Sequence, residues 1–201
     1  MVSWRENRWL LVGISLGITL AVVTPVLWVV LSGPGPQAPS ATEQASSRLA
    51  AERREVEMQC AAVQDRYVQK LDLIPSLYNE TLGYSQFERG MLEDLVRLRS
   101  EWRNTPPGEL RGNIANEIDN NLVQVRQVYE SYPELQSVQA LRDLFDEIAG
   151  TENRITYERS LYNGRIRDYN DFVGSLPEGI ALAIGANPLP FDNPVGAGCP
   201  P

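Results

Sequence analysis

Apolar side chains recur at intervals of three and four residues along most of the chain after residue 48. That spacing places them on one face of a helix, and no segment alternates as a strand would. The pattern predicts three long helices, over residues 48–84, 86–132 and 137–173, with the second interrupted near Pro106. Short connections favour antiparallel neighbours, so we expect the first and third helices to run parallel. The predicted fold is an all-α antiparallel bundle of three long helices.

The third predicted helix carries a stripe with a seven-residue repeat. Ile155, Tyr162 and Tyr169 recur at that interval, and Ile166 lies between them. Polar side chains that share or flank the stripe are Glu152, Arg159, Asn163 and Asn170. Covered polar groups must find hydrogen bonds, so the stripe needs partner helices along its length. We interpret it as the seam of the bundle and predict that Tyr162 and Ile166 are core residues, not ligand contacts; a polar ligand groove along the same stripe is the alternative.

Pro75 lies inside the first predicted helix. A proline has no backbone N–H, so it disturbs the helix and frees the carbonyl of Leu71. Packing around Ile74 and Leu77 can absorb the resulting kink in a bundle. A functional groove at the kink is the alternative interpretation.

The N-terminal region contains a long apolar run without charged residues, from Trp9 to Ser32. As a helix it would be roughly 36 Å long, enough to span a hydrocarbon core of about 30 Å. A cleavable signal peptide is the rival interpretation, but the run is too long for an ordinary signal and no good cleavage site follows it closely. Arg5 and Arg8 precede the run, whereas residues 33–47 contain no Lys or Arg. We therefore predict a single-pass membrane protein with a cytoplasmic N-terminus and an extracytoplasmic bundle.

Composition divides the chain into five parts. Residues 1–8 form a short N-terminal flank, residues 9–32 the predicted transmembrane helix, and residues 33–47 a Pro/Gly/Ser linker. Residues 48–174 hold the predicted bundle, and residues 175–201 form a Gly- and Pro-rich irregular tail.

The charge and the absence of histidine exclude several classes of function. The net charge is -8 and Lys70 is the single lysine, so nucleic acid is a poor partner. Without histidine, Ser-His and Cys-His dyads and His-ligated zinc cannot form. Paired carboxylates can hold two metals in a bundle, but such sites normally add a Glu-x-x-His motif. We expect no catalytic residues, no metal site and no cofactor.

Two cysteines, Cys60 and Cys199, lie far apart in the sequence and form no CxxC motif. The sequence does not decide whether they pair. We interpret Cys60 as a small buried apolar residue on the helix seam. Cys199 lies in the tail, where an exposed thiol or an intermolecular bridge is conceivable.

Four motifs, in order, resemble those of the LemA family over roughly Cys60 to Phe191. They are the DLIP run Asp72 to Pro75, the turn Tyr132-Pro133-Glu134-Leu135, the TENRI run (with Glu152 and Asn153) followed by the pairs Tyr162-Asn163 and Tyr169-Asn170, and a Pro-rich tail with Leu176-Pro177 and the run Asn187 to Phe191. The resemblance implies a membrane-anchored, helical, non-enzymatic protein. The chain departs from the family pattern after the predicted span, where arginines are common in the family.

Motif and stripe residues together give the candidate interaction or structural residues. They are Asp72, Pro75, Tyr132, Pro133, Glu152, Asn153, Arg159, Tyr162, Asn163, Tyr169 and Asn170. Two functions remain open. In the first, the bundle is a scaffold or protein-interaction module at the cell envelope, for example an accessory subunit of a larger membrane complex. In the second, it binds a small or lipid-like ligand near the Pro75 kink and the Tyr/Asn stripe.

Overall fold

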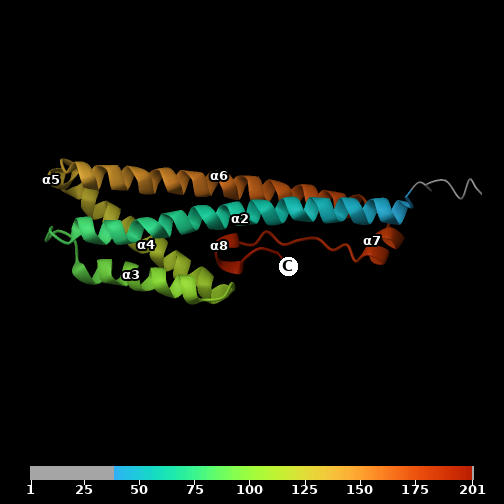
Figure 1. Cartoon of the computed structure of the whole chain (residues 1–201), viewed down its shortest axis with the longest axis horizontal. Coiled ribbons are helices and arrows are strands. Elements are labelled where there is room, and N and C mark those ends of the chain that lie inside the picture. Colours follow the sequence, from blue (N-terminus) through green and yellow to red (C-terminus); the bar gives the residue numbers. More distant parts are fainter. Residues whose placement is uncertain (1–38, 201) are drawn as a thin grey trace, which may run out of the picture. The chain divides into compact units, whose positions relative to one another are not determined.

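The structure is a computed structural model that describes residues 39–200. The chain divides into two compact units, Met1–Ser40 and Ala41–Pro201, and the second is described here by itself (Figure 1). The predicted flank 1–8, the predicted transmembrane helix 9–32 and the first part of the linker lie outside the described residues. Among residues 39–200, no helix has the length and apolar character needed to cross a membrane.

Helices make up the second unit. They are α2 (Ala41–Thr81), α3 (Arg89–Asn104), α4 (Glu109–Ser131), α5 (Pro133–Gln136), α6 (Gln139–Ser175), α7 (Glu178–Ile184) and α8 (Pro194–Ala197). No strand occurs between residues 39 and 200. The prediction of an all-α bundle is confirmed for this part of the chain.

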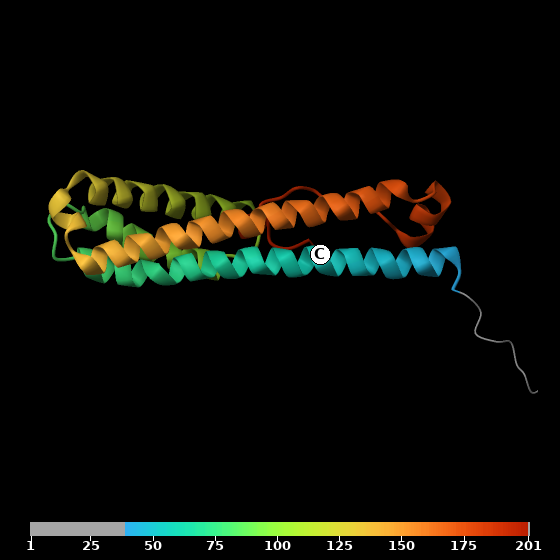
Figure 2. The same cartoon turned by 90° about the horizontal axis from the view of Figure 1, so that it is seen from above.

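The two long helices α2 and α6 lie side by side and run antiparallel (Figures 1 and 2). Glu55 lies 3.6 Å from Arg165, and the Gln59 side chain donates to Glu158 over 2.6 Å. As the residue number rises along α2, that of its partner falls along α6. The apolar faces of both helices, with those of α3 and α4, form one core.

The predicted parallel orientation of the first and third helices is wrong. The segment over residues 86–132 is not one interrupted helix but a hairpin of α3 and α4. Pro106 and Pro107 cannot continue a helix, and Gly108 has φ 154°, a conformation that favours glycine. The chain therefore reverses once more than predicted, and this extra reversal makes α6 antiparallel to α2.

Helix α2 begins at Ala41 and thus includes residues that the sequence analysis assigned to the linker. Pro39 is the last proline before it, and the following Ala, Glu and Gln residues have good helix propensity. The linker prediction is therefore wrong for residues 41–47.

Pro75 lies within α2, which continues to Thr81. The carbonyl of Leu71 accepts a hydrogen bond from Arg99 Nε of α3 at 2.8 Å. The carboxylate of Asp72 accepts from Arg99 Nη2 at 3.0 Å and also from Arg103. Both motif residues therefore link α2 to α3. Pro75 leaves the Leu71 carbonyl free to accept from Arg99, and the Asp72 carboxylate accepts from Arg99 and Arg103.

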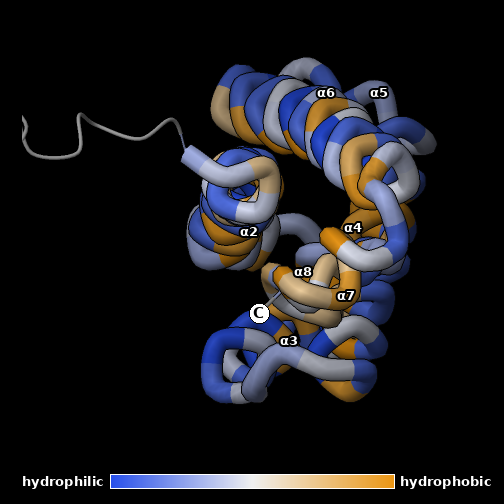
Figure 3. The backbone as a smooth tube through the Cα atoms, turned by 90° about the vertical axis from the view of Figure 1, so that its right-hand side faces the viewer, coloured by the Kyte–Doolittle hydropathy of each residue, from blue (hydrophilic) through white to orange (hydrophobic). Residues whose placement is uncertain are grey.

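The tail is more ordered than the irregular segment predicted over residues 175–201. Helix α7 contacts α2, and α8 contacts both α2 and α4, between which it lies in Figure 3. The stretch between α7 and α8 returns along the bundle in the direction opposite to α6 (Figure 1). The whole of residues 185–200, which includes α8, covers the part of the α2–α6 pair that the shorter α3–α4 hairpin leaves open.

Candidate functional site

The tail-facing side of α6 recognises the backbone of the tail. Asn170 Nδ2 donates to the carbonyl of Leu189 at 2.9 Å, and the Leu189 N–H donates back to Asn170 Oδ1 at 2.7 Å. A primary amide has both a donor and an acceptor, so it can pair with a peptide group as a neighbouring strand does. Asn170 therefore fixes the position of the extended chain on α6.

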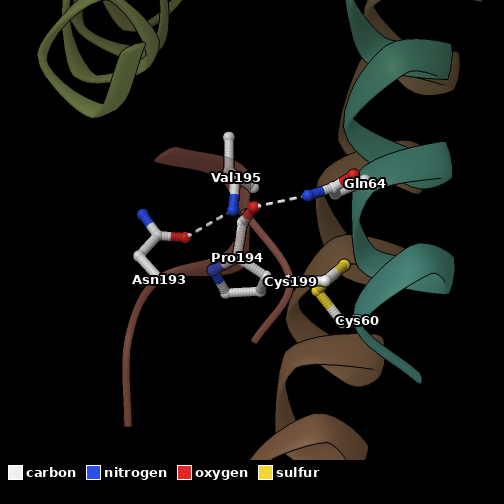
Figure 4. The surroundings of a disulfide bond; sticks show 6 residues. All are labelled: Cys60, Gln64, Asn193, Pro194, Val195 and Cys199. Carbon is white, nitrogen blue, oxygen red and sulfur yellow. Dashed lines mark hydrogen bonds between the residues drawn. A yellow bond between two sulfur atoms is a disulfide. The ribbon is translucent and has the colours of Figure 1, made fainter. Parts of the chain in front are cut away.

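Helix α8 is held in a similar way between α2 and α4. Gln64 Nε2 donates to the Pro194 carbonyl at 3.0 Å (Figure 4), and Gly108 N–H donates to the Gly196 carbonyl at 2.9 Å. A Cβ on Gly196 would lie 2.5 Å from the Cα of Gly112. Only glycine permits this approach, so a small residue is required where the tail crosses α4.

A disulfide between Cys60 and Cys199 links the tail covalently to α2 (Figure 4). Cys60 is buried, as predicted, but as one half of a disulfide, not as a free apolar residue. The interpretation of Cys199 as an exposed thiol or an intermolecular bridge is wrong. The two residues are 139 positions apart, and only the return of the tail along the bundle brings them together. The even number of cysteines was the one signal for this bond in the sequence.

An open hollow of about 270 Å³ lies between α6 and the tail. Its lining residues are Arg159, Tyr162 and Asn163 from α6, and Phe191, Asp192, Asn193 and Pro194 from the tail. Arg159 Nη2 donates to Asn193 Oδ1 at 3.1 Å, and the same oxygen accepts from the Val195 N–H at 3.2 Å. Asn193 thereby positions the guanidinium at the edge of the hollow.

Two buried polar atoms at this hollow have no hydrogen-bond partner in the described part of the chain, namely Arg159 Nε and the Tyr162 hydroxyl. Tyr162 is only 1% exposed. Burial raises the pKa of Tyr162, and the negative charge of Asp192 raises it further, so the hydroxyl keeps its proton. Both groups are therefore donors without an acceptor.

A second hollow, of about 160 Å³, lies on the other side of Arg159. Its wall contains Lys70, which is 4% exposed and whose ammonium lies 2.6 Å from Asp119. The single hydroxyl proton of Tyr67 has two acceptors within reach, the Asp119 carboxylate at 3.2 Å and the Ala115 carbonyl at 3.1 Å. Burial and the nearby Asp119 charge raise the pKa of Tyr67 well above its ordinary value.

This buried group was not predicted from the sequence, although the pattern contained a signal for it. Lys70 follows Tyr67 by three residues and precedes Ile74 by four, which puts a charge on the apolar face of α2. A buried ammonium needs a carboxylate partner, and Asp119 of α4 provides it. This group joins α2 to α4 through the ion pair between Lys70 and Asp119. In residues 39–200 no cluster of His, Cys, Asp or Glu could hold a metal ion.

Comparison with known proteins identifies the family. Residues 59–188, more than half of the chain, match the LemA family. The chain belongs to the LemA family. No curated protein sequence matches it. The LemA match includes Cys60 and Asn170 but ends before Leu189 and Cys199, so the outer part of the docked tail lies beyond the matched region.

The candidate residues fall at four separate places. Asp72 and Pro75 join α2 to α3, and Tyr132 and Pro133 form the exposed turn between α4 and α5. In the TENRI run, Glu152 lies 3.5 Å from Arg126 of α4, and Asn153 is exposed. The remaining candidates, Arg159, Tyr162, Asn163, Tyr169 and Asn170, all belong to the final part of α6. The predicted residues therefore do not form one site.

The expected partner helix of this final group is α2, which packs along α6, and the tail adds contacts to Arg159 and Asn170. Tyr162 and Ile166 are buried, which confirms that they are core residues, and Tyr169 is buried as well. The further prediction that neither contacts a ligand is untested, and the unpartnered hydroxyl of Tyr162 argues against it for that residue. Asn163 is exposed at the rim of the larger hollow. Asn170 and Arg159 bind the tail, which explains why polar residues are tolerated on a buried stripe.

Proposed function

We propose that this LemA protein is a non-enzymatic, single-pass membrane protein whose bundle binds other membrane or envelope proteins outside the cytoplasm. The proposal has two parts, a location and a binding surface. Each is supported by a different feature and can be tested separately.

The location is supported by charge placement and by the disulfide. Arg5 and Arg8 precede the apolar run 9–32, and no basic residue follows it until Arg48. A bond such as Cys60–Cys199 forms and persists in oxidising compartments and is rare in a reducing cytoplasm. Both features favour an extracytoplasmic bundle.

We expect Cys60 and Cys199 to be oxidised in intact cells. The measurement is alkylation of free thiols before lysis with a reagent that adds mass, followed by electrophoresis without reductant. The native protein should gain no mass unless a membrane-impermeant reductant is first added outside the cells. A cytoplasmic thiol protein from the same cells should be alkylated in both cases. Free thiols before any reductant is added would contradict the proposed location.

The binding surface is a stripe on α6, which we call the outer stripe and define by the exposed residues Arg154, Tyr157 and Leu161 and the half-buried glycines Gly150 and Gly164. These residues follow one another at intervals of four and three, as along the seam of a coiled coil. Tyr157 is 63% exposed and Leu161 is 39% exposed. Two large apolar side chains one turn apart thus face away from the core.

Gly164 is the observation that carries the proposal. It lies inside the long helix α6, and a Cβ added to it would meet nothing within 4 Å. A glycine inside a helix is destabilising by roughly 0.5–1 kcal/mol relative to alanine. The packing of this chain gives no reason for that cost, whereas close approach of a partner helix beside Leu161 would.

The alanine variant Gly164→Ala should stabilise the isolated protein by about 0.5–1 kcal/mol while weakening partner binding. The measurements are a thermal melt and co-purification from cross-linked membranes. Gly174→Ala is the matched control, because Gly174 also lies on α6 with nothing within 4 Å and is about 80° around the helix from Gly164. Gly174 lies in the last turn of α6, where glycine costs less than in the helix interior, so the control should gain less stability than Gly164→Ala and keep its partners. If both variants recover as much partner protein as the parent does, Gly164 is not part of the interface.

A second candidate function is ligand binding along the Tyr/Asn stripe. It is favoured by the hollow at Arg159 and Tyr162, where two buried donors lack acceptors. The Pro75 kink gives this function less support, because Arg99 already occupies the carbonyl of Leu71.

A further inference from the structure

The hollow between α6 and the tail is a built site with opposite charges on its walls. Arg159 supplies the positive charge and Asp192 the negative charge. Within residues 39–200 neither of them forms an ion pair, with each other or with a third residue. Two opposite charges that face one small space without neutralising each other are suited to a ligand that carries both.

The positive side of the hollow provides donors for a carboxylate. Arg159 Nε and the Tyr162 hydroxyl are buried and unpartnered, while Arg159 Nη2 is held by Asn193 at 3.1 Å. A carboxylate has two oxygens that accept from arginine and hydroxyl groups at the same time. Its binding would supply the acceptors that both buried donors lack.

The negative side provides an acceptor for a cation. Asp192 is exposed at the wall of the hollow, which it lines together with Arg159 and Tyr162. An ammonium group bonded to the same carbon atom as the ligand carboxylate would be placed near both. Phe191, which is 59% exposed, offers an apolar surface at the rim.

We propose that this hollow binds the zwitterionic main chain of a free α-amino acid, with an apolar side chain against Phe191. Arg159 and Tyr162 hold the carboxylate, and Asp192 holds the ammonium group. A volume of about 270 Å³ lies just below the usual range for ligand pockets, so it fits a molecule of this size and not a large lipid. This inference is independent of the outer stripe, because the hollow lies on the side of α6 that faces the tail.

The probe is L-leucine, titrated calorimetrically into the full-length protein in nanodiscs. We expect saturable binding with one site. L-leucinamide lacks the carboxylate and N-acetyl-L-leucine lacks the ammonium group, and each should bind at least tenfold more weakly. No saturable heat with L-leucine at millimolar concentration, or equal binding of either analogue, would overturn the proposal.

Two substitutions connect the binding to the named groups. Tyr162→Phe removes a hydroxyl that makes no hydrogen bond within the described residues, so the variant should fold normally yet bind L-leucine at least tenfold more weakly. Asp192→Asn should reduce L-leucine binding similarly and leave the weak binding of N-acetyl-L-leucine unchanged. Asp171→Asn is the matched control, an exposed carboxylate on α6 outside the hollow, and should bind as the parent does. Undiminished binding by the folded Tyr162→Phe and Asp192→Asn variants would place the ligand elsewhere.

Discussion

Replacing Cys60 and Cys199 together by alanine should lower the free energy of unfolding by about 3–5 kcal/mol. The bond closes a long loop, since the cysteines are 139 residues apart, and a longer loop restricts the unfolded chain more. The measurement is denaturant unfolding of the full-length protein under oxidising conditions. Addition of a reductant to the parent should reproduce the loss.

The single variants provide the control for this prediction. Cys60→Ala and Cys199→Ala each break the same bond, so each should lose about as much stability as the double variant. If the stability losses of the two single variants instead sum to the loss of the double variant, packing of the individual side chains, and not the covalent link, accounts for the stability.

Truncation of the core at Ile166 is expected to have the next largest effect. Ile166 is 0% exposed, on the buried face of α6 between Tyr162 and Tyr169. Ile166→Ala should cost about 2–4 kcal/mol through lost apolar contact and the cavity left behind. Thermal or denaturant unfolding measures the change.

Leu161→Ala provides a comparison on the same helix. Leu161 is 39% exposed and belongs to the outer stripe, so its truncation should change the stability of the isolated protein by only about 0.5 kcal/mol. Melting of the Ile166→Ala variant at the parent temperature would mean that the buried face of α6 is not packed as described.

The sequence predicted the helices well because their evidence is local. Spacing of apolar residues by three and four located α2, α3, α4 and α6 and identified Tyr162 and Ile166 as buried. Motif order likewise indicated the LemA family, which the match over residues 59–188 confirms. Neither conclusion required knowledge of which helix contacts which.

Helix direction could not be derived from the same pattern. Pro106 and Pro107 stop a helix whether the chain then continues onward or turns back. The choice depends on whether the second half packs better beside α3, and α4 does so. Ile118 and Leu122 of α4 belong to the same buried core as the apolar residues of α3. Because this one chain reversal was not predicted, the predicted direction of α6 relative to α2 was wrong.

The partners of the polar stripe could not be predicted from the sequence either. They are backbone groups of a tail whose apolar residues show little periodicity. Asn170 recognises a peptide group at Leu189, so no particular side chain in the tail marks the contact. The hollow at Arg159 exists only because the tail closes one side of it. Long-range contacts of this kind leave no pattern in a single sequence.

The disulfide also determines how tension would pass through the protein. A pull between the N-terminal side and the last residues would travel along α2 to Cys60, across the sulfur atoms to Cys199, and out of the chain. Everything from residue 61 to residue 198, including α3, α4 and α6, lies in a closed covalent loop that such a pull does not stretch. The bundle can therefore stay folded while its two ends are drawn apart, and within residues 39–200 the first half of α2, up to Cys60, is the helical segment exposed to the force.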